Sequence, residues 1–134
     1  YISDLNQRLE IYRRIYLANS LSTLNAIREE IEDRYGAVPE ELEKLLDTLE
    51  IRILCQKLHI SRAKIKSGEA KLFIEPSTPL NPSIILDVLD DNFILKSEFK
   101  LIVRLKGAGW RNDIILIKKY LGDLCEGLQQ FQAI

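Results

Sequence analysis

The stretch EEIEDRYGAVPEE, residues 29–41, places a glycine and a proline three positions apart within a crowd of carboxylates. Gly36 stands where a helix end needs a residue in the left-handed region, and Pro39 fits the first position of a following helix. Glu40 and Glu41 favour the positive end of that second helix. The stretch therefore predicts a corner between two helices that also displays several charged side chains.

Apolar residues at helical spacing extend outward from this corner in both directions. A helix is predicted from about Ser22 up to Gly36, and another continues from Pro39 through Leu58. An earlier helix, capped by Ser3 and ending near Asn19 and Ser20, is also predicted. The predicted core stripes are Leu5, Leu9, Tyr12 and Tyr16 in the earliest helix, and Leu24, Ile27, Ile31 and Tyr35 in the helix before the corner.

The apolar period changes after residue 60. Residues 63–76 read as two extended runs around Ser67 and Gly68, and residues 92–107 as a second pair. Pro82 starts a short helix between the two pairs, and a last helix runs from about Asp113. The sequence thus predicts an α+β fold: an N-terminal helical array, then a small antiparallel sheet interrupted and closed by helices. We expect one domain, 1–134, with helices over residues 1–60 and mixed strands and helices over residues 61–134.

Composition narrows the class of protein. The chain is 46% hydrophobic and 29% charged, which indicates a globular domain, and it has no apolar run of the roughly 20 residues that span a bilayer. It starts without Met or a signal pattern, as a piece of a longer protein would. Cys55 and Cys125 are expected to be buried free thiols in a reducing compartment. We expect no metal site, because His59 is the single histidine. We expect no cofactor in this domain, because the sequence has no complete glycine motif for phosphate binding.

Charge is balanced over the whole chain but uneven along it. The net charge is −1, so the domain lacks the basic footprint of a dedicated nucleic-acid binder. Residues 28–50 are strongly acidic, whereas residues 52–71 and 100–111 are basic. These runs are either alternating solvated faces or surfaces for partners of opposite charge.

No catalytic constellation emerges from the residue pattern. The glycines at 107 and 109 follow an extended run, but Asn112 occupies the position of the third glycine of a dinucleotide site. His59 is expected to cap a helix end, and no nucleophile is marked as its partner. Trp110 is expected to pack against the last helix, with an exposed partner anchor as the alternative. We therefore expect this domain not to be an enzyme.

The stretches YISDLNQRLEIYRRI, EEIEDRYGAVPEELEKLL and IRILCQKLHI resemble the C-terminal domain of bacterial transcription-repair coupling factors. The first motif of the match is Arg8, Leu9, Tyr12, Arg13 and Arg14, and the second is Glu30, Asp33, Arg34, Tyr35, Gly36 and Pro39. The resemblance runs over most of the chain and is weaker after Ser61. His59 departs from it, because the family commonly has glycine there.

The resemblance implies a role inside a larger bacterial protein of the cytoplasm. Such proteins are ATP-dependent, helicase-like DNA translocases that displace RNA polymerase stalled at DNA damage and recruit nucleotide excision repair through UvrA. ATP, magnesium, DNA and polymerase would be bound by other domains. The C-terminal domain is implied to be an autoinhibitory clamp that docks on the UvrB-like N-terminal module and masks UvrA binding. The docking surface of the family corresponds here to Glu30, Asp33 and Arg34.

Helix geometry agrees with that implied role. Glu30, Asp33 and Arg34 stand at i, i+3 and i+4, so they share one flank beside the apolar stripe. The leading hypothesis is a non-catalytic interaction domain that uses these three residues. The second is an auxiliary nucleic-acid contact through the basic segments 52–71 and 100–111. The third is an enzyme with an unrecognised pocket.

Overall fold

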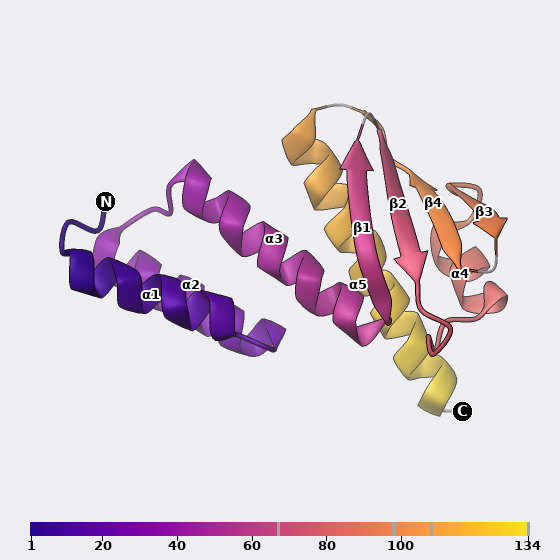
Figure 1. Cartoon of the computed structure of the whole chain (residues 1–134), viewed down its shortest axis with the longest axis horizontal. Helices are drawn as coiled ribbons and strands as arrows, with labels where there is room; N and C mark the ends of the chain where they lie inside the picture. The colour runs from indigo at the N-terminus through magenta and orange to yellow at the C-terminus, as the bar shows by residue number, and fades with distance from the viewer. Residues whose placement is uncertain (67, 98, 108, 134) are drawn as a thin grey trace. The chain divides into compact units, whose positions relative to one another are not determined.

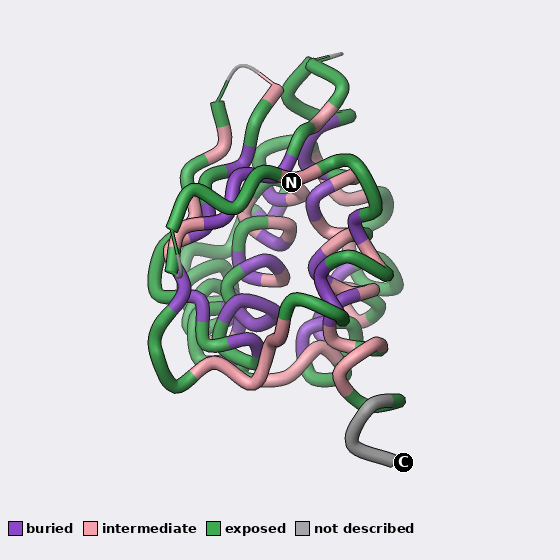
Figure 2. Tube along the Cα trace, turned by 90° about the vertical axis from the view of Figure 1, so that its right-hand side faces the viewer, coloured by how far each residue is buried: buried purple, intermediate pink, exposed green. Residues whose placement is uncertain are grey.

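The computed structural model describes residues 1–66, 68–97, 99–107 and 109–133, with side chains of the last helix described to residue 130. The chain divides into two compact units, Tyr1–Ile53 and Leu54–Ile134. Within the described ranges, no helix combines the length and the apolar character needed to cross a membrane. Most helices are buried along one side and exposed along the other (Figure 2).

The first unit is helical. It contains α1 (Leu5–Leu17), α2 (Leu21–Tyr35) and most of α3 (Glu40–Lys57). The prediction of a Ser3 cap is wrong, because the Asp4 side chain accepts the Gln7 amide at 3.0 Å and carboxylates cap helices well. Ser20 caps α2 in the same way through the Thr23 amide.

The corner after α2 lies at the predicted glycine and proline, but Pro39 stands one position earlier relative to α3 than predicted. Gly36 has a φ of 89° and its amide donates to the Glu32 carbonyl, so it ends α2 in a conformation that few other residues adopt. The Pro39 carbonyl accepts the Glu43 amide at 2.9 Å, which places Pro39 at the cap and starts α3 one residue later, at Glu40.

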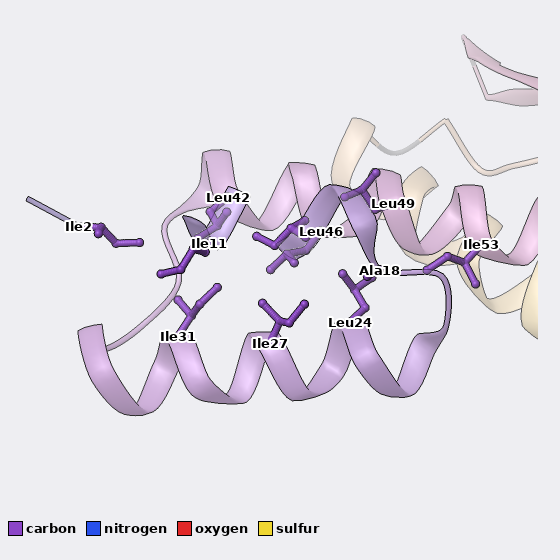
Figure 3. Packing of buried hydrophobic residues seen from close by; sticks show 11 residues of the cluster. Ile2, Ile11, Ala18, Leu24, Ile27, Ile31, Leu42, Leu46, Leu49 and Ile53 are labelled. Carbon is purple, nitrogen blue, oxygen red and sulfur yellow. The ribbon is translucent and has the colours of Figure 1, made fainter. Parts of the chain in front are cut away.

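One hydrophobic cluster holds the first unit together. Leu24, Ile27 and Ile31 point from α2 toward α1 and α3 (Figure 3). Their partners are Ile2, Ile11, Ile15, Ala18, Leu42, Leu46, Leu49 and Ile53. Ile15 and Leu46 are completely buried, and each such side chain contributes roughly 1.5–3 kcal/mol by leaving water.

The predicted core stripe of α1 is wrong. Ile11 and Ile15 face the cluster, whereas Leu5, Leu9 and Tyr16 are each more than half exposed and Tyr12 is 36% exposed. The helix carries two apolar faces, and α2 and α3 pack against the isoleucine face. The predicted stripe of α2 is confirmed at its three aliphatic positions.

The second unit is a four-stranded antiparallel sheet with helices. The strand order is β1-β2-β4-β3, and the prediction of an α+β fold is confirmed. The elements are β1 (Ile60–Lys66), β2 (Glu69–Ile74), α4 (Pro82–Leu89), β3 (Phe93–Ser97), β4 (Lys100–Arg104) and α5 (Trp110–Ala133). Figure 1 shows α4 and α5 on one side of the sheet.

The two faces of the sheet differ in chemistry. Ala70 and Leu72 of β2 and Leu101 and Val103 of β4 are completely buried on the inner face. Lys71 and Arg104, which alternate with them, are exposed on the outer face, where Ile102 of β4 is the buried exception. This period of two is the pattern of a sheet with one face packed and the other solvated.

Two glycines fix how β2 lies beside β4. A Cβ on Gly68 would meet the Gly107 Cα at 3.3 Å, and the Leu105 amide donates to the Gly68 carbonyl at 2.7 Å. Both glycines have positive φ, so each meets a conformational demand as well as a steric one. Ser67, which was predicted in the same turn, lies outside the described residues.

The last helix begins at Trp110, three residues before the predicted Asp113. Asp113 is buried and its carboxylate accepts the Gly107 amide at 3.1 Å, which explains why an acidic residue is found there. The buried apolar residues of α5 are those predicted, Ile114, Ile117, Leu121 and Leu124, with Leu128 partly buried. The predicted Phe131 falls outside the described side chains.

Gly122 and Gly127 of α5 provide a matched test of the packing of α4. Nothing lies within 4 Å of a Cβ built on Gly122, whereas one on Gly127 would meet Ile84 Cγ2 at 3.3 Å and Val88 Cγ2 at 3.4 Å. We expect Gly122→Ala to raise the free energy of unfolding by about 0.5–1 kcal/mol through helix propensity. Gly127→Ala should gain less, because α4 has to shift. Urea unfolding measures both, and equal gains would contradict the close packing.

Candidate protein-interaction surface

The three predicted interaction residues lie on one side of α2, a surface we call the α2 flank (Glu30, Asp33 and Arg34). Asp33 and Arg34 are exposed, and the Glu30 side chain is 40% exposed. Asp33 makes no hydrogen bond or ion pair with any other described residue. The Arg34 guanidinium carbon lies 5.2 Å from the centroid of the Tyr35 ring. The structure therefore brings the three charges together beside the packed stripe.

Glu30 has a partner inside the unit. Arg14 Nη1 of α1 lies 2.5 Å from Glu30 Oε2, and both side chains are about 40% exposed. A pair this exposed contributes at most about 1 kcal/mol to stability. Glu30 thus joins α1 to α2 and still presents part of its carboxylate to solvent.

Arginines connect the other two pairs of helices as well. Arg28 of α2 contacts both carboxylate oxygens of Glu43 in α3, at 2.5 and 2.6 Å. Arg52 of α3 donates to the Tyr16 carbonyl at the end of α1, at 3.1 Å. Since each arginine crosses from one helix to another, the three helices are held in register around the hydrophobic cluster.

Tyrosines fix the end of α2 that carries the flank. The Tyr1 hydroxyl donates to the Gly36 carbonyl at 2.7 Å, and the Tyr35 hydroxyl donates to Gln7 Oε1 at 2.9 Å. The two tyrosine rings also lie 5.9 Å apart in a tilted arrangement. The corner is therefore built into the unit, and the α2 flank is displayed from a fixed support.

Sequence reasoning did not predict a second exposed surface, which lies on α1. The α1 stripe (Leu5, Leu9, Tyr12 and Tyr16) is apolar and faces solvent. A contiguous row of apolar side chains is uncommon on the exposed face of a helix, and it often marks a contact with another protein. The signal was in the sequence, because α1 has more apolar residues than one core-facing stripe needs.

The remaining candidates for chemistry form no catalytic set. His59 has a φ of 56°, and its Nδ1 lies 2.9 Å from Ser77 Oγ, which in turn lies 3.5 Å from Glu75 Oε2. A hydrolytic triad needs the histidine between the hydroxyl and the acid, whereas here the serine is in the middle. His59 instead serves the turn from α3 into β1. A hollow of about 470 Å³ beside α4 and α5 is lined by neither histidine nor cysteine.

The two cysteines are free, as predicted, but only Cys55 is buried, whereas Cys125 is partly exposed. Burial raises the pKa of the Cys55 thiol to about 11, with a further contribution from Cys125. Burial also raises the pKa of Cys125. Both thiols are therefore protonated and poorly nucleophilic at neutral pH. Within the described ranges, no cluster of His, Cys, Asp or Glu has the arrangement that holds a metal.

Trp110 begins α5 and is 48% exposed. It also has contacts of its own in the structure. A half-exposed indole at a helix start agrees with either packing or a partner anchor.

Comparisons with known proteins agree with the resemblance. The family model described as "TRCF domain" matches residues 1–85. The transcription-repair-coupling factor of Haemophilus influenzae is 34% identical over 91 residues, which are 66% of this chain and 8% of that protein. The protein of the same name from Myxococcus xanthus is 27% identical over 128 residues, 92% of this chain and 11% of that protein. The chain thus spans about a tenth of these relatives.

A solved structure shares the fold. The crystal structure of the C-terminal domain of a transcription-repair coupling factor superposes with a TM-score of 0.76 at 21% identity. The match covers 97% of this chain and 83% of that one.

The cysteine environment predicts a pH-dependent reactivity. With a pKa of about 11, on the order of one Cys55 thiol in a thousand is ionised at pH 8. We expect iodoacetamide to modify Cys125 first and Cys55 slowly, with the Cys55 rate rising about tenfold per pH unit up to pH 10. Mass spectrometry of the folded protein measures this order, and urea-unfolded protein is the control. Rapid modification of Cys55 at pH 8 in the folded protein would contradict its burial.

Proposed function

Because this chain belongs to the TRCF domain family, we propose that it is a non-catalytic, regulatory interaction domain of a transcription-repair coupling factor. In this proposal it docks through the α2 flank on a UvrB-like N-terminal module of the same protein and masks the surface that binds UvrA. The observation that carries the proposal is the exposure of Asp33 and Arg34 beside a fixed corner.

The proposed parent protein is a cytoplasmic, ATP-dependent DNA translocase. It displaces RNA polymerase stalled at DNA damage and recruits nucleotide excision repair. Motor, polymerase contact and UvrA contact belong to other domains in this proposal, and this domain restrains them without a cofactor of its own. The chemistry of the described residues supports a binding role, since they offer charged and apolar surfaces and no nucleophile with an aligned base.

The α2 flank suits a reversible contact between charged surfaces. Arg34 offers a planar fork for a carboxylate, and Asp33 accepts from arginine or lysine. Partly desolvated pairs of this kind are worth on the order of 1–3 kcal/mol each, and exposed pairs less. Such a range suffices for a contact within one protein, because a covalent link raises the effective concentration of the two surfaces.

Glu30 differs from its two neighbours in this contact. An incoming arginine has to share the Glu30 carboxylate with Arg14, which lies 2.5 Å away. Asp33 has no such competitor among the described residues. We therefore expect Asp33 and Arg34 to contribute more to docking than Glu30, and Glu30 to contribute also to the attachment of α1.

Single charge changes on one helix test this proposal. Binding of the 134-residue chain to the separately produced N-terminal module of its parent protein is measured by calorimetry at low salt. We expect Asp33→Asn or Arg34→Gln to weaken binding roughly tenfold, the loss of one partly desolvated pair. Glu32→Gln is the matched control, because Glu32 is exposed on α2 and stands neither three nor four residues from any member of the flank. It should change the affinity less than about twofold.

Two results would count against the proposal. If the wild-type chain fails to bind the module, the docking function is wrong. If the wild-type chain binds but the flank variants bind as tightly as the control variant, docking uses another surface. The α1 stripe is then the first surface to test. Thermal unfolding followed by circular dichroism shows that each variant is folded.

A further inference from the structure

The outer face of the sheet gathers six cations that the sequence scatters over 43 positions. We call Arg62, Lys64, Lys66, Lys71, Lys100 and Arg104 the basic sheet face. Directly paired residues of antiparallel strands project to the same side. The pairing gives three rows across β1, β2 and β4: Arg62, Phe73, Lys100; Lys64, Lys71, Ile102; and Lys66, Glu69, Arg104. Glu69 is the one acid in these rows.

The gathering of cations on one face lowers the stability of the folded sheet. Lys64 and Lys71 stand directly opposite each other, and like charges in that position repel. Within the described ranges of the chain, Lys64, Lys66, Lys71 and Arg104 form no salt bridge. A surface that keeps unpaired cations together, in a chain of net charge −1, fits an anionic ligand.

Protection of a sheet edge does not explain the pattern. Lysines on edge strands often prevent sheets from pairing with each other, and Lys64 and Lys66 lie on the edge strand β1. Lys71, however, lies on β2, and Lys100 and Arg104 lie on β4, and both of these strands are internal. Cations on internal strands protect no edge. Edge protection therefore does not explain three of the six cations of the basic sheet face.

An aromatic ring lies among the cations. Phe73 is partly buried, with the Arg62 guanidinium carbon 4.8 Å and the Lys100 ammonium 5.7 Å from the ring centroid. The ring holds the planar guanidinium over a flat apolar surface. Together they offer the stacking surface on which proteins place unpaired bases, and the surrounding lysines offer contacts to phosphates.

We propose that the basic sheet face binds a single strand of nucleic acid. Lys64, Lys71 and Arg104 contact its phosphates, and a base stacks beside Phe73 and Arg62. A duplex fits less well, since four strands about 4.8 Å apart, with their side chains, exceed the roughly 12 Å major groove. An acidic peptide would use the charges but not the stacking surface. This proposal concerns the second unit and is independent of docking through α2.

The test is fluorescence anisotropy of labelled oligonucleotides of about 16 nucleotides at about 50 mM salt. Single-stranded DNA, single-stranded RNA and duplex DNA are titrated with the full 134-residue chain. We expect both single strands to bind more tightly than the duplex, and their relative affinities identify DNA or RNA as the preferred source.

Two triple variants distinguish binding at the basic sheet face from a general effect of positive charge. The face variant is Lys64→Gln, Lys71→Gln and Arg104→Gln, and its control is Lys57→Gln, Arg111→Gln and Lys119→Gln, which removes the same charge from helices. We expect the face variant to lose roughly tenfold or more in affinity and about 2 in the slope of log K against log salt. The control should lose less than about threefold. Phe73→Leu should weaken single-strand binding roughly fivefold or more, by loss of stacking.

Any of four results would overturn the proposal: no binding of single strands at low salt, equal losses in the two triple variants, tighter binding of duplex, or displacement of the oligonucleotide by polyglutamate at an equal concentration of charge. The last result would assign the face to an acidic protein. Thermal unfolding confirms that all three variants are folded before binding is compared.

Discussion

The first unit depends on the burial of one aliphatic stripe of α2 between α1 and α3. Leu24, Ile27 and Ile31 supply that stripe, and everything charged on α2 is placed by their burial. With the stripe turned inward, Arg28 falls on the side of α3 and Glu30 on the side of α1, where each finds an opposite charge. Asp33 lies further round the helix and remains in solvent. The same packing that gives stability therefore selects which charges are used inside the unit and which are left for a partner.

The second unit depends on a different constraint, the alternation of side chains along its strands. Leu72 and Leu101 are paired on the inner face, and Lys71 and Ile102 are paired on the outer one. Because β2 and β4 are internal strands, each has a paired strand on both sides. Cations on their outer face therefore lie next to side chains of the neighbouring strands. The basic surface is thus a property of the sheet and of no single segment.

Much of this arrangement can be predicted from sequence, and the failures have physical reasons. The corner was predictable because Gly36 and Pro39 each have a restricted backbone role, and the α2 flank followed from spacing along one helix. The core face of α1 could not be predicted, because Ile11 and Ile15 form one apolar face and four other apolar residues form a second. Only the helices that pack against α1 decide which of the two faces is buried. The pairing of Arg14 with Glu30 joins two helices, and the basic sheet face joins three strands. Neither follows from local periodicity, since both depend on tertiary register.

The close approach of Gly68 and Gly107 has a consequence for how relatives of this chain can vary. It locks the alignment of β2 with β4, and a slip of one residue would turn every lysine of a strand inward and every leucine outward. Exchange of lysine for arginine on the outer face leaves that alignment intact. Insertion or deletion of one residue in either strand does not, so strand length should be preserved more strictly than the identity of any one cation.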